Sequence, residues 1–460
     1  MRRGFICLLL ALPAAGAGAP RATVVTWPAP PEEKLSEDYT VEADGKPVAV
    51  YAARTLDEPF AGKQWNHGGP YSFACFDFEG RVRVRVTSKK PLDRVVVRPE
   101  SYGLRPAVQG NGLTLEFDRP RKISIEPDGK NGPLLLFANP LETVRPKAGD
   151  PDVIHFGPGT HKPERIRVGS GQTLYVSGGA VVKGGVHVTG KNVRILGRGI
   201  LCGNDWAWTR GPGNLIGLQD ASDVQIEGVI LRGCWGWTLV PRGCDRVTIT
   251  NVKICNGRVQ NDDGINPCNS RNVTVRDCFI RSDDDCLALK GLRLEGENNN
   301  VEDVTVEDCT LWCDRARIVL MGHESRAKFM RRVVFRNIDI IHYVMTPFLL
   351  EPGEEMVMED VRFENIRLHG EGQNDFITLR PVVNQYMRNK VPGHIRNIRF
   401  ENVSITGAPG AYRIRVQGAD EAHQVQGVVF RKVTRRGEAV AAPSAGVQVG
   451  NFTKDVQFGP

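Results

Sequence analysis

The chain has 460 residues, too many for one small hydrophobic core, so two domains are expected. A hydrophobic content of 41% and a charged content of 25% are those of an ordinary globular protein, and they exclude the extreme compositions of disordered and fibrous chains. The formal net charge of +7 is small for this length. It permits an acidic substrate, but a slightly basic solvated surface explains it equally well, and we expect no nucleic-acid partner.

Residues 1–19 have the features of a secretory signal peptide. The basic start Met1-Arg2-Arg3 precedes a short apolar run, Phe5 to Ala14, and small-residue cleavage sites follow within Ala15 to Ala19. The apolar run is too short to cross a bilayer, and no other segment is long and apolar enough. We therefore expect an exported protein, secreted or periplasmic, with no membrane span.

Residues 22–148 predict short strands joined by turns. Asp44-Gly45 is a hairpin signal, and Phe73 to Val86 alternates apolar with polar residues. Strand signals at such short intervals favour an all-β sandwich. Three prolines mark the boundary with the next region of the chain: Pro140, Pro146 and Pro151.

From about residue 150 to residue 460 a short pattern recurs, in which two apolar residues in alternation are followed by Asn, Asp or Gly and another apolar residue. The copies begin 23, 26, 31, 29, 28, 37 and 30 residues apart, and the last is frayed. Their first residues are Val224, Val247, Val273, Val304, Val333, Val361, Ile398 and Val428.

Each copy has the composition of one half-buried strand followed by a tight bend. Asn, Asp and Gly tolerate the left-handed backbone that such a bend needs. Helix-period segments are nearly absent, which disfavours helical solenoids. The repeat therefore predicts a right-handed parallel β-helix whose coils stack about 4.8 Å apart.

The cysteines do not follow the pattern of a small disulfide scaffold. Eleven are present, and Cys7 lies in the expected signal peptide. Cys278 and Cys309 fall in the apolar column of the repeat, where we expect free core residues. Cys309 and Cys313 are close enough in sequence to bridge, and this alternative stays open. No Cys/His spacing suggests zinc, so no metal site is expected.

Second strands lie between the copies, and two aspartate clusters lie at their edge. The clusters are Asn261-Asp262-Asp263-Gly264 and Asp283-Asp284-Asp285-Cys286, with Asp263 and Asp284 21 residues apart, about one coil. The expected second strands cover 237–240, 264–267, 286–289, 318–321, 348–351 and 377–380. If these strands stack, the carboxylates of adjacent coils converge.

Crowded carboxylates cannot all ionise easily, so the pKa of one should rise. A proton donor beside carboxylates that activate water is what an inverting glycosidase requires. The alternative is that each cluster only makes a turn, as Asp often does, and Asp262 and Asp283 fit that reading. Because consecutive strand residues point to opposite faces, Asp284 and Asp285 can share a site only at a bend.

The stretch from Trp237 to Gly291 resembles glycoside hydrolase family 28, the polygalacturonase family, and its relative family 49, the dextranase and isopullulanase family. Residues 237–241, Trp-Thr-Leu-Val-Pro, resemble the family's Trp-x-Leu-His-Pro. Residues 261–264, Asn-Asp-Asp-Gly, resemble Asn-Thr-Asp-Gly, and residues 284–290 resemble Asp-Asp-Cys-Ile-Ala-Ile-Lys.

This resemblance implies a right-handed parallel β-helix and inverting hydrolysis without a cofactor. It implies Asp284 as the general acid, and Asp263 and Asp285 as the residues that hold and deprotonate water. It also implies that Asn261 contacts substrate.

Two departures from family 28 bear on the substrate. Arg315-Ala316-Arg317 stands where the family carries Gly-His-Gly, so an arginine there could hold Asp263 or Asp285 ionised. Leu349-Leu350-Glu351 stands where polygalacturonases carry Arg-x-Lys, and a glutamate would repel a galacturonate carboxylate. We therefore expect a neutral α-linked glycan, as in family 49.

Further candidate substrate-binding residues lie at or near the ends of the stacked strands, where each could equally be a surface charge or a core residue. They are Trp237, Lys290, Arg315, Arg317, His323, Glu351 and Arg380. Three alternative functions stay open: a polygalacturonase-type pectin hydrolase, a polysaccharide lyase and a non-catalytic glycan-binding β-helix. The sequence does not indicate an oligomeric state.

Overall fold

The computed structural model describes residues 22–56, 69–293, 299–442 and 444–459, so the expected signal peptide, residues 1–19, lies outside the described residues. Strands dominate these ranges, and a 3-10 turn, η1 (Glu100–Tyr102), accompanies them. No helix with the length and hydropathy of a membrane span occurs in the described ranges.

Two mainly antiparallel sheets form the N-terminal part. One contains β1 (Thr23–Val25), β4 (Val50–Thr55), β5 (Gly69–Glu79), β7 (Val96–Arg98), β10 (Arg121–Glu126) and β11 (Leu134–Pro140). The other contains β2 (Tyr39–Ala43), β3 (Lys46–Val48), β6 (Val82–Ser88), β8 (Ala107–Gln109) and β9 (Gly112–Phe117). Their facing side chains share one buried apolar cluster, as in a β-sandwich.

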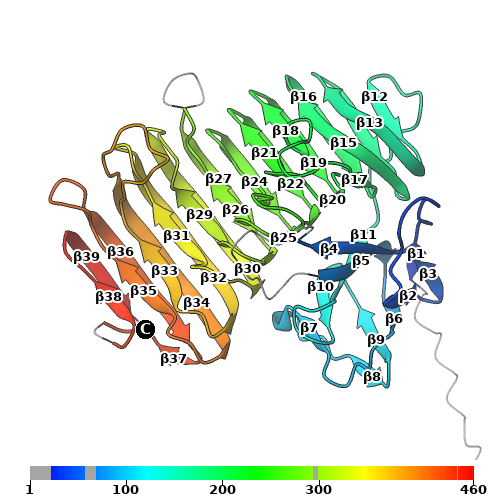
Figure 1. Cartoon of the computed structure of the whole chain (residues 1–460), viewed down its shortest axis with the longest axis horizontal. Coiled ribbons are helices and arrows are strands. Elements are labelled where there is room, and N and C mark those ends of the chain that lie inside the picture. Colours follow the sequence, from blue (N-terminus) through cyan, green and yellow to red (C-terminus); the bar gives the residue numbers. More distant parts are fainter. Residues whose placement is uncertain (1–21, 57–68, 294–298, 443, 460) are drawn as a thin grey trace, which may run out of the picture.

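The rest of the chain winds into coils whose strands pair almost entirely in parallel (Figure 1). The largest sheet begins with β12 (Val153–Phe156), β13 (Gly159–Val168), β14 (Thr173–Val176), β15 (Ala180–Val188), β16 (Lys191–Gly197), β17 (Ile200–Cys202), β18 (Ile216–Gln219), β19 (Ser222–Glu227), β20 (Ile230–Arg232), β21 (Leu239–Arg242) and β22 (Asp245–Thr250). It continues with β23 (Lys253–Cys255), β24 (Arg271–Arg276), β25 (Phe279–Ser282), β27 (Val301–Glu307), β28 (Thr310–Cys313), β30 (Phe329–His342), β32 (Val357–Glu371), β34 (His394–Ala408), β36 (Val425–Arg435), β37 (Glu438–Ala439) and β39 (Thr453–Gly459). A separate sheet contains β26 (Leu287–Leu289), β29 (Val319–Gly322), β31 (Phe348–Glu351), β33 (Asp375–Leu379), β35 (Arg413–Val416) and β38 (Val447–Val449).

The repeat register is the one that the sequence predicts. Val224 pairs with Val247, Val247 with Val273, and the series continues through every copy to Val428. The copy that looked frayed is fully in register and pairs with one more strand, at Val456. The bend residues Asn251, Asp277, Asp308, Asn337, Asn365, Asn402 and Lys432 all have a left-handed backbone.

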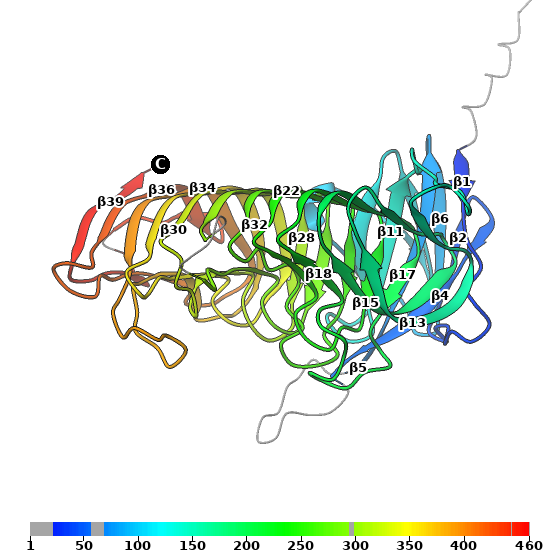
Figure 2. The same ribbon diagram turned by 90° about the horizontal axis from the view of Figure 1, so that it is seen from above.

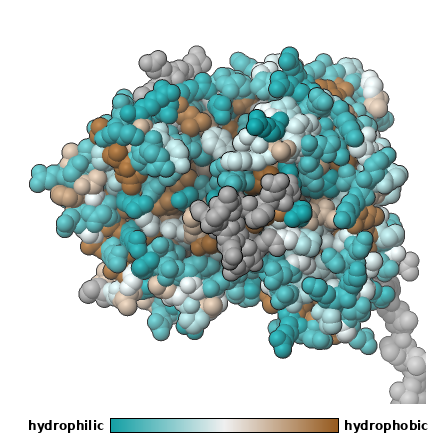
Figure 3. All heavy atoms as spheres, in the orientation of Figure 1, coloured by the Kyte–Doolittle hydropathy of each residue, from teal (hydrophilic) through white to brown (hydrophobic). Residues whose placement is uncertain are grey.

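The predicted fold class, a β-sandwich followed by a parallel β-helix, is confirmed. Figure 2 shows the coils stacked along one axis with the sandwich beside their N-terminal half. Cys278, Cys309 and Cys313 are buried free thiols, so the suggested Cys309–Cys313 bridge does not form. On the face drawn in Figure 3 hydrophilic residues predominate and apolar ones are scattered, because the apolar columns lie inside the coils.

The sandwich packs against the outer face of β20, β23, β25 and β28. Phe73 and Phe137 of the sandwich share an apolar cluster with Ile230, Phe279 and Trp312 of the β-helix. The hydroxyl of Tyr71, on β5, donates a hydrogen bond of 2.9 Å to the carbonyl of Asn256, five residues before the first aspartate cluster. The sandwich thus supports the segment that leads into the candidate site.

Candidate functional site

One column of residues on successive coils forms the base of the site. Leu239 lies opposite Ile265, Ile265 opposite Leu287, and Leu287 opposite Val319. The positions two residues earlier on each coil therefore also stack, and they hold Trp237, Asp263, Asp285 and Arg317. The backbone amide of Gly264 donates a hydrogen bond of 2.9 Å to the carbonyl of Asp285, which fixes this register. The two aspartates face each other because the coils are in register.

Asp284 joins them because the chain bends between β25 and β26. Residues 283–286 are not in a strand, which meets the condition that Asp284 and Asp285 share a site only at a bend. Asp262 stabilises the neighbouring turn, since its buried carboxylate accepts hydrogen bonds from the amides of Gly257 (2.7 Å), Arg258 (3.1 Å) and Asp283 (2.7 Å). Asp262 therefore fits the turn-forming alternative.

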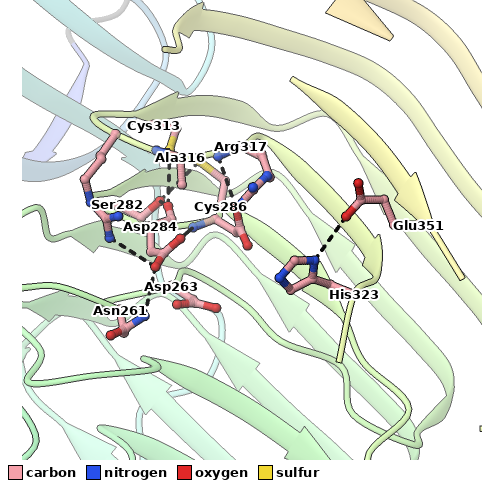
Figure 4. Close-up of polar contacts among 12 residues, drawn as sticks. Asn261, Asp263, Ser282, Asp284, Cys286, Cys313, Ala316, Arg317, His323 and Glu351 are labelled. Atoms are coloured by element: carbon pink, nitrogen blue, oxygen red, sulfur yellow. Dashed lines mark hydrogen bonds and ion pairs between the residues drawn. The ribbon is translucent and has the colours of Figure 1, made fainter. Parts of the chain in front are cut away.

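Asp284 is the most accessible of the three carboxylates that the sequence singled out, with 15% of its side chain exposed against 1% for Asp263 and 4% for Asp285. Its Oδ2 accepts hydrogen bonds from the side-chain amide of Asn261 (3.0 Å) and from the Arg315 guanidinium (3.1 Å). Its Oδ1 accepts one from the backbone amide of Asp285 (3.0 Å). Figure 4 shows Asp284 between Asn261 and the residues of the following coil. These three donors hold the Asp284 carboxylate at the solvent-accessible side of the aspartate group.

Asp263 is buried and incompletely satisfied. Its Oδ2 accepts a hydrogen bond of 2.8 Å from the Asn266 amide and lies 3.5 Å from the Lys290 ammonium. Its Oδ1 is buried and accepts no hydrogen bond from any residue that the structure describes. A buried carboxylate oxygen without a donor is costly, so this atom is suited to accept a proton or a hydrogen bond from a bound molecule.

Burial makes it unfavourable for all the carboxylates of this group to be ionised at once. Desolvation raises the pKa of Asp263 well above its usual value, and the charges of Asp284 and Asp285 raise it further against the opposing charge of Lys290. Desolvation, with the charge of Asp284, raises the pKa of Asp285 to about 7. Because these carboxylates interact, the proton belongs to the group and not to a single residue.

The two arginines in place of the family histidine contact different carboxylates. The Arg317 amide donates a hydrogen bond of 3.0 Å to Asp285, and its guanidinium lies 3.8 Å from the same oxygen. Arg315 pairs with Asp283 (2.7 Å) and Asp284 (3.1 Å). Arg317 is thus placed next to Asp285, one of the two carboxylates that the sequence suggested an arginine would hold ionised.

Lys290 lies between the aspartates and Trp237. Its ammonium donates a hydrogen bond of 2.6 Å to Glu324 and lies 3.9 Å from the centre of the Trp237 ring. Trp237 is partly exposed, whereas its neighbour Trp235 is a core residue, 2% exposed. Trp237 therefore keeps the exposure that a sugar-binding ring requires, and Trp235 does not.

His323, Glu351 and Arg380 form a separate group, part of which is drawn to the right in Figure 4. Glu351, 3% exposed, accepts hydrogen bonds from His323 (3.0 Å) and Arg380 (2.7 Å). Burial alone would raise the pKa of Glu351, but the contacts with His323 and Arg380 hold that pKa below its usual value. The glutamate is thus a neutralised internal carboxylate, not an exposed negative charge.

Sequence reasoning missed Asn266, the amide donor to Asp263. A signal was present, since Asn266 is a polar residue within the expected second strand 264–267; the structure has isolated bridges at Ile265 and Cys268 there instead of a strand, and Asn266 between them is fully buried. Its effect depends on how the chain turns after Gly264, which the sequence pattern does not specify.

The family comparison covers the segment that contains these residues. Residues 185–295 match the model of the glycosyl hydrolases family 28. A probable polygalacturonase from Vitis vinifera is 35% identical over 114 residues, 23% of this chain and 22% of that protein. A probable exopolygalacturonase B from Aspergillus terreus is 26% identical over 236 residues, 47% of this chain and 45% of that protein. The matches thus span less than half the length of these curated relatives.

Solved structures with the same fold cover almost the whole chain. Dex49A from Penicillium minioluteum superposes with a TM-score of 0.70 at 15% identity, covering 94% of this chain and 96% of that one. The family 28 exopolygalacturonase of Yersinia enterocolitica gives a TM-score of 0.56 at 13% identity, covering 95% and 96%. Taken together, the comparisons confirm the predicted resemblance to the right-handed β-helix proteins of glycoside hydrolase families 28 and 49.

Proposed function

We propose that the protein is an inverting glycoside hydrolase that cleaves an O-glycosidic bond of an α-linked polysaccharide or oligosaccharide. The observation that supports this most is the carboxylate group on two adjacent coils, in which one member is accessible and two are buried. In such a site one carboxyl protonates the leaving oxygen, and a carboxylate on the other side removes a proton from water.

Asp284 acts as the general acid in this proposal. It is the member of the group that a glycosidic oxygen reaches first, because the other two are almost fully buried. Asn261 and Arg315 hold its carboxyl group in place. As the bond breaks, the proton passes from Asp284 to the leaving-group oxygen, and the sugar ring gains positive charge at its anomeric carbon.

Asp263 and Asp285 hold and deprotonate the attacking water. The free Oδ1 of Asp263 accepts a hydrogen bond from that water, and Arg317 favours the ionised form of Asp285. The water oxygen forms the new bond to the anomeric carbon on the face opposite the leaving group, and its proton passes to a carboxylate. The configuration at that carbon is therefore inverted.

The proposed substrate is a neutral glycan, because the nearby cations are already paired inside the protein. Lys290 is bound to Glu324, Arg317 lies against Asp285, and Arg380 is bound to Glu351. A galacturonate carboxylate would have to compete with these partners for a cation. Polygalacturonate hydrolysis is the second candidate, since both curated relatives carry polygalacturonase names.

Replacing Asp284 by Asn tests the role of the general acid. We expect activity on the preferred member of a glycan panel to fall about 10²–10⁴-fold, while far-ultraviolet circular dichroism stays unchanged. The matched control is Asp308→Asn, an exposed bend position whose left-handed backbone Asn adopts equally well. Full activity in the Asp284→Asn variant would show that Asp284 is not the general acid.

Product analysis tests the rest of the proposal. Proton NMR of the first product should show the β-anomer from an α-linked substrate, and a retained α-configuration would contradict inversion. Dextran and polygalacturonate in one assay separate the two candidate substrates. An unsaturated product absorbing in the ultraviolet would instead indicate a lyase, and sugar binding without turnover would indicate a non-catalytic β-helix.

A separate proposal is that residues 1–19 direct the export of the protein. Mass spectrometry of the protein recovered from the periplasm or medium should find a mature chain that begins close to Ala19. An uncleaved chain retained with the cytoplasmic fraction would contradict it.

A further inference from the structure

A group of side chains far from the aspartates converges at one corner of the C-terminal coils. Glu355 lies in the turn between β31 and β32, His394 is the first residue of β34, and His423 lies two residues before β36. None of the three has a part in the proposed hydrolysis. One ligand atom from each of the three lies within 4.8 Å of the other two.

Coil stacking brings them together. Val357 of β32 pairs with His394, and Ile395 of β34 pairs with Val425 of β36, so the three residues belong to three successive coils. The Glu355 amide also donates a hydrogen bond of 3.1 Å to the carbonyl of Pro392, two residues before His394. The backbone therefore fixes the separation of the side chains.

The Glu355 carboxylate lies close to both imidazole rings. The Nε2 of His394 lies 3.1 Å from one carboxylate oxygen of Glu355, and the Nε2 of His423 lies 3.4 Å from the other. The two imidazole rings are 4.9 Å apart and inclined by 34°. A tetrahedral zinc ion with bonds of about 2.0–2.1 Å requires ligand atoms about 3.4 Å apart.

Asp420 fixes the tautomer of one ring. Its carboxylate lies 2.8 Å and 3.0 Å from the Nδ1 of His423, which therefore donates its proton there. The Nε2 of the same ring points toward an oxygen of Glu355, 3.4 Å away, which is the orientation in which it could bind a metal ion.

The chemistry of these donors selects the cation. Two imidazole nitrogens and one carboxylate are the ligands of zinc sites that keep a fourth position open, and imidazole suits Zn²⁺, Cu²⁺ and Ni²⁺ rather than Ca²⁺ or Mg²⁺. A carboxylate behind a histidine ligand is the usual support of such a site.

We propose that Glu355, His394 and His423 bind a divalent transition-metal ion, with Zn²⁺ as the natural probe, and that Asp420 positions His423 for it. The ion would link three successive coils at this corner. The proposal does not depend on the hydrolase function, because its readouts need no turnover.

Tag-free full-length protein, treated with a chelator and dialysed, provides the test. Calorimetry should show one Zn²⁺ bound per chain, and Zn²⁺ should raise the melting temperature. His394→Gln and His423→Gln should each weaken binding at least about 10²-fold, and Asp420→Asn about 10–100-fold. His187→Gln, at an exposed histidine on a distant coil, is the matched control and should bind like the parent.

Cobalt spectroscopy keeps the test decisive even where a variant folds poorly. Co²⁺ in the parent protein should give the intense visible bands of a four-coordinate site, and Zn²⁺ should displace them. Absence of a stoichiometric site in the parent, or unchanged binding in both histidine variants, would overturn the proposal and leave a protonated His–Glu cluster as the explanation of the contacts.

Discussion

Two buried carboxylates, Asp263 and Asp314, lie two coils apart, and they differ in how their oxygens are satisfied. Asp314, fully buried, accepts hydrogen bonds from Arg281 (2.9 and 3.2 Å) and from the Trp312 indole (2.7 Å). Asp263, equally buried, has one amide donor and one oxygen without any donor in the described ranges. A satisfied buried carboxylate stabilises the fold, whereas an unsatisfied one is available for chemistry.

The residues around Asp314 and those around Asp263 differ in the same way. Arg281, the partner of Asp314, lies between the Tyr71 ring of the sandwich and the Trp312 ring of the β-helix, at 4.3 and 3.9 Å from their centres. Asp314 therefore helps to join the two parts of the molecule. Asp263 instead faces Asp284 and Asp285, whose like charges oppose its ionisation. Substitutions in the two groups should therefore have different effects.

The largest effect is expected at the unsatisfied group. Replacing Asp263 by Asn should lower kcat about 10²–10⁴-fold, because the attacking water loses its base, while the free energy of unfolding stays the same or rises. Urea unfolding and steady-state kinetics on the same preparation measure both. A variant that lost stability and activity together would show that Asp263 is structural after all.

At Asp314, whose oxygens are satisfied, we expect a substitution to lower stability instead. Asp314→Ala should lower the free energy of unfolding by about 3–5 kcal/mol, because it leaves the buried Arg281 charge unpaired. The double variant Arg281→Met with Asp314→Ala should recover part of this loss, since no unpaired charge remains. If the single variant unfolds like the parent in urea, the ion pair does not stabilise the fold.

Stability should depend on pH through Asp285, whose pKa is raised to about 7 from an ordinary value of 3.8. The folded state binds the proton more tightly than the unfolded state, so this contribution is present below about pH 4 and is lost as pH rises through about 7. Asp285→Asn should remove it. The difference in unfolding free energy between parent and variant, measured from pH 4 to 8, should therefore slope; a flat difference would mean that the Asp285 pKa is not raised.

How much of the molecule could be predicted depends on where the information lies in the chain. The apolar alternation and the bend residues are local, so the register from Val224 to Val428 and the left-handed bends could be predicted from sequence. The stacking of Asp263 and Asp285 on one column follows from that register. The donors could not be predicted, because Asn266 and Lys290 reach Asp263 only through the path of the chain after each bend.

The corner at Glu355, His394 and His423 shows the same limit. These residues lie 39 and 29 positions apart, and no short motif links them. They meet only because loops of different length return to the same corner of successive coils. The expectation of no metal site rested on local Cys/His spacing, which does not consider ligands supplied by three coils, and the proposed Zn²⁺ titration is its test.

The smallest effect is expected at Glu351, and it concerns specificity. Glu351 accepts hydrogen bonds from His323 and Arg380, and Glu351→Gln would remove the negative charge while keeping the size of the side chain. The guanidinium of Arg380, half exposed, would then be free to meet a substrate carboxylate. We expect the ratio of kcat/KM on polygalacturonate to that on a neutral α-glucan to rise a few-fold, with Glu401→Gln, at an exposed position on a later strand, as the control. An unchanged ratio would mean that the pairing of Arg380 does not decide between acidic and neutral glycans, and the preference would then have to lie nearer the aspartates, beside which Lys290, Arg315 and Arg317 lie.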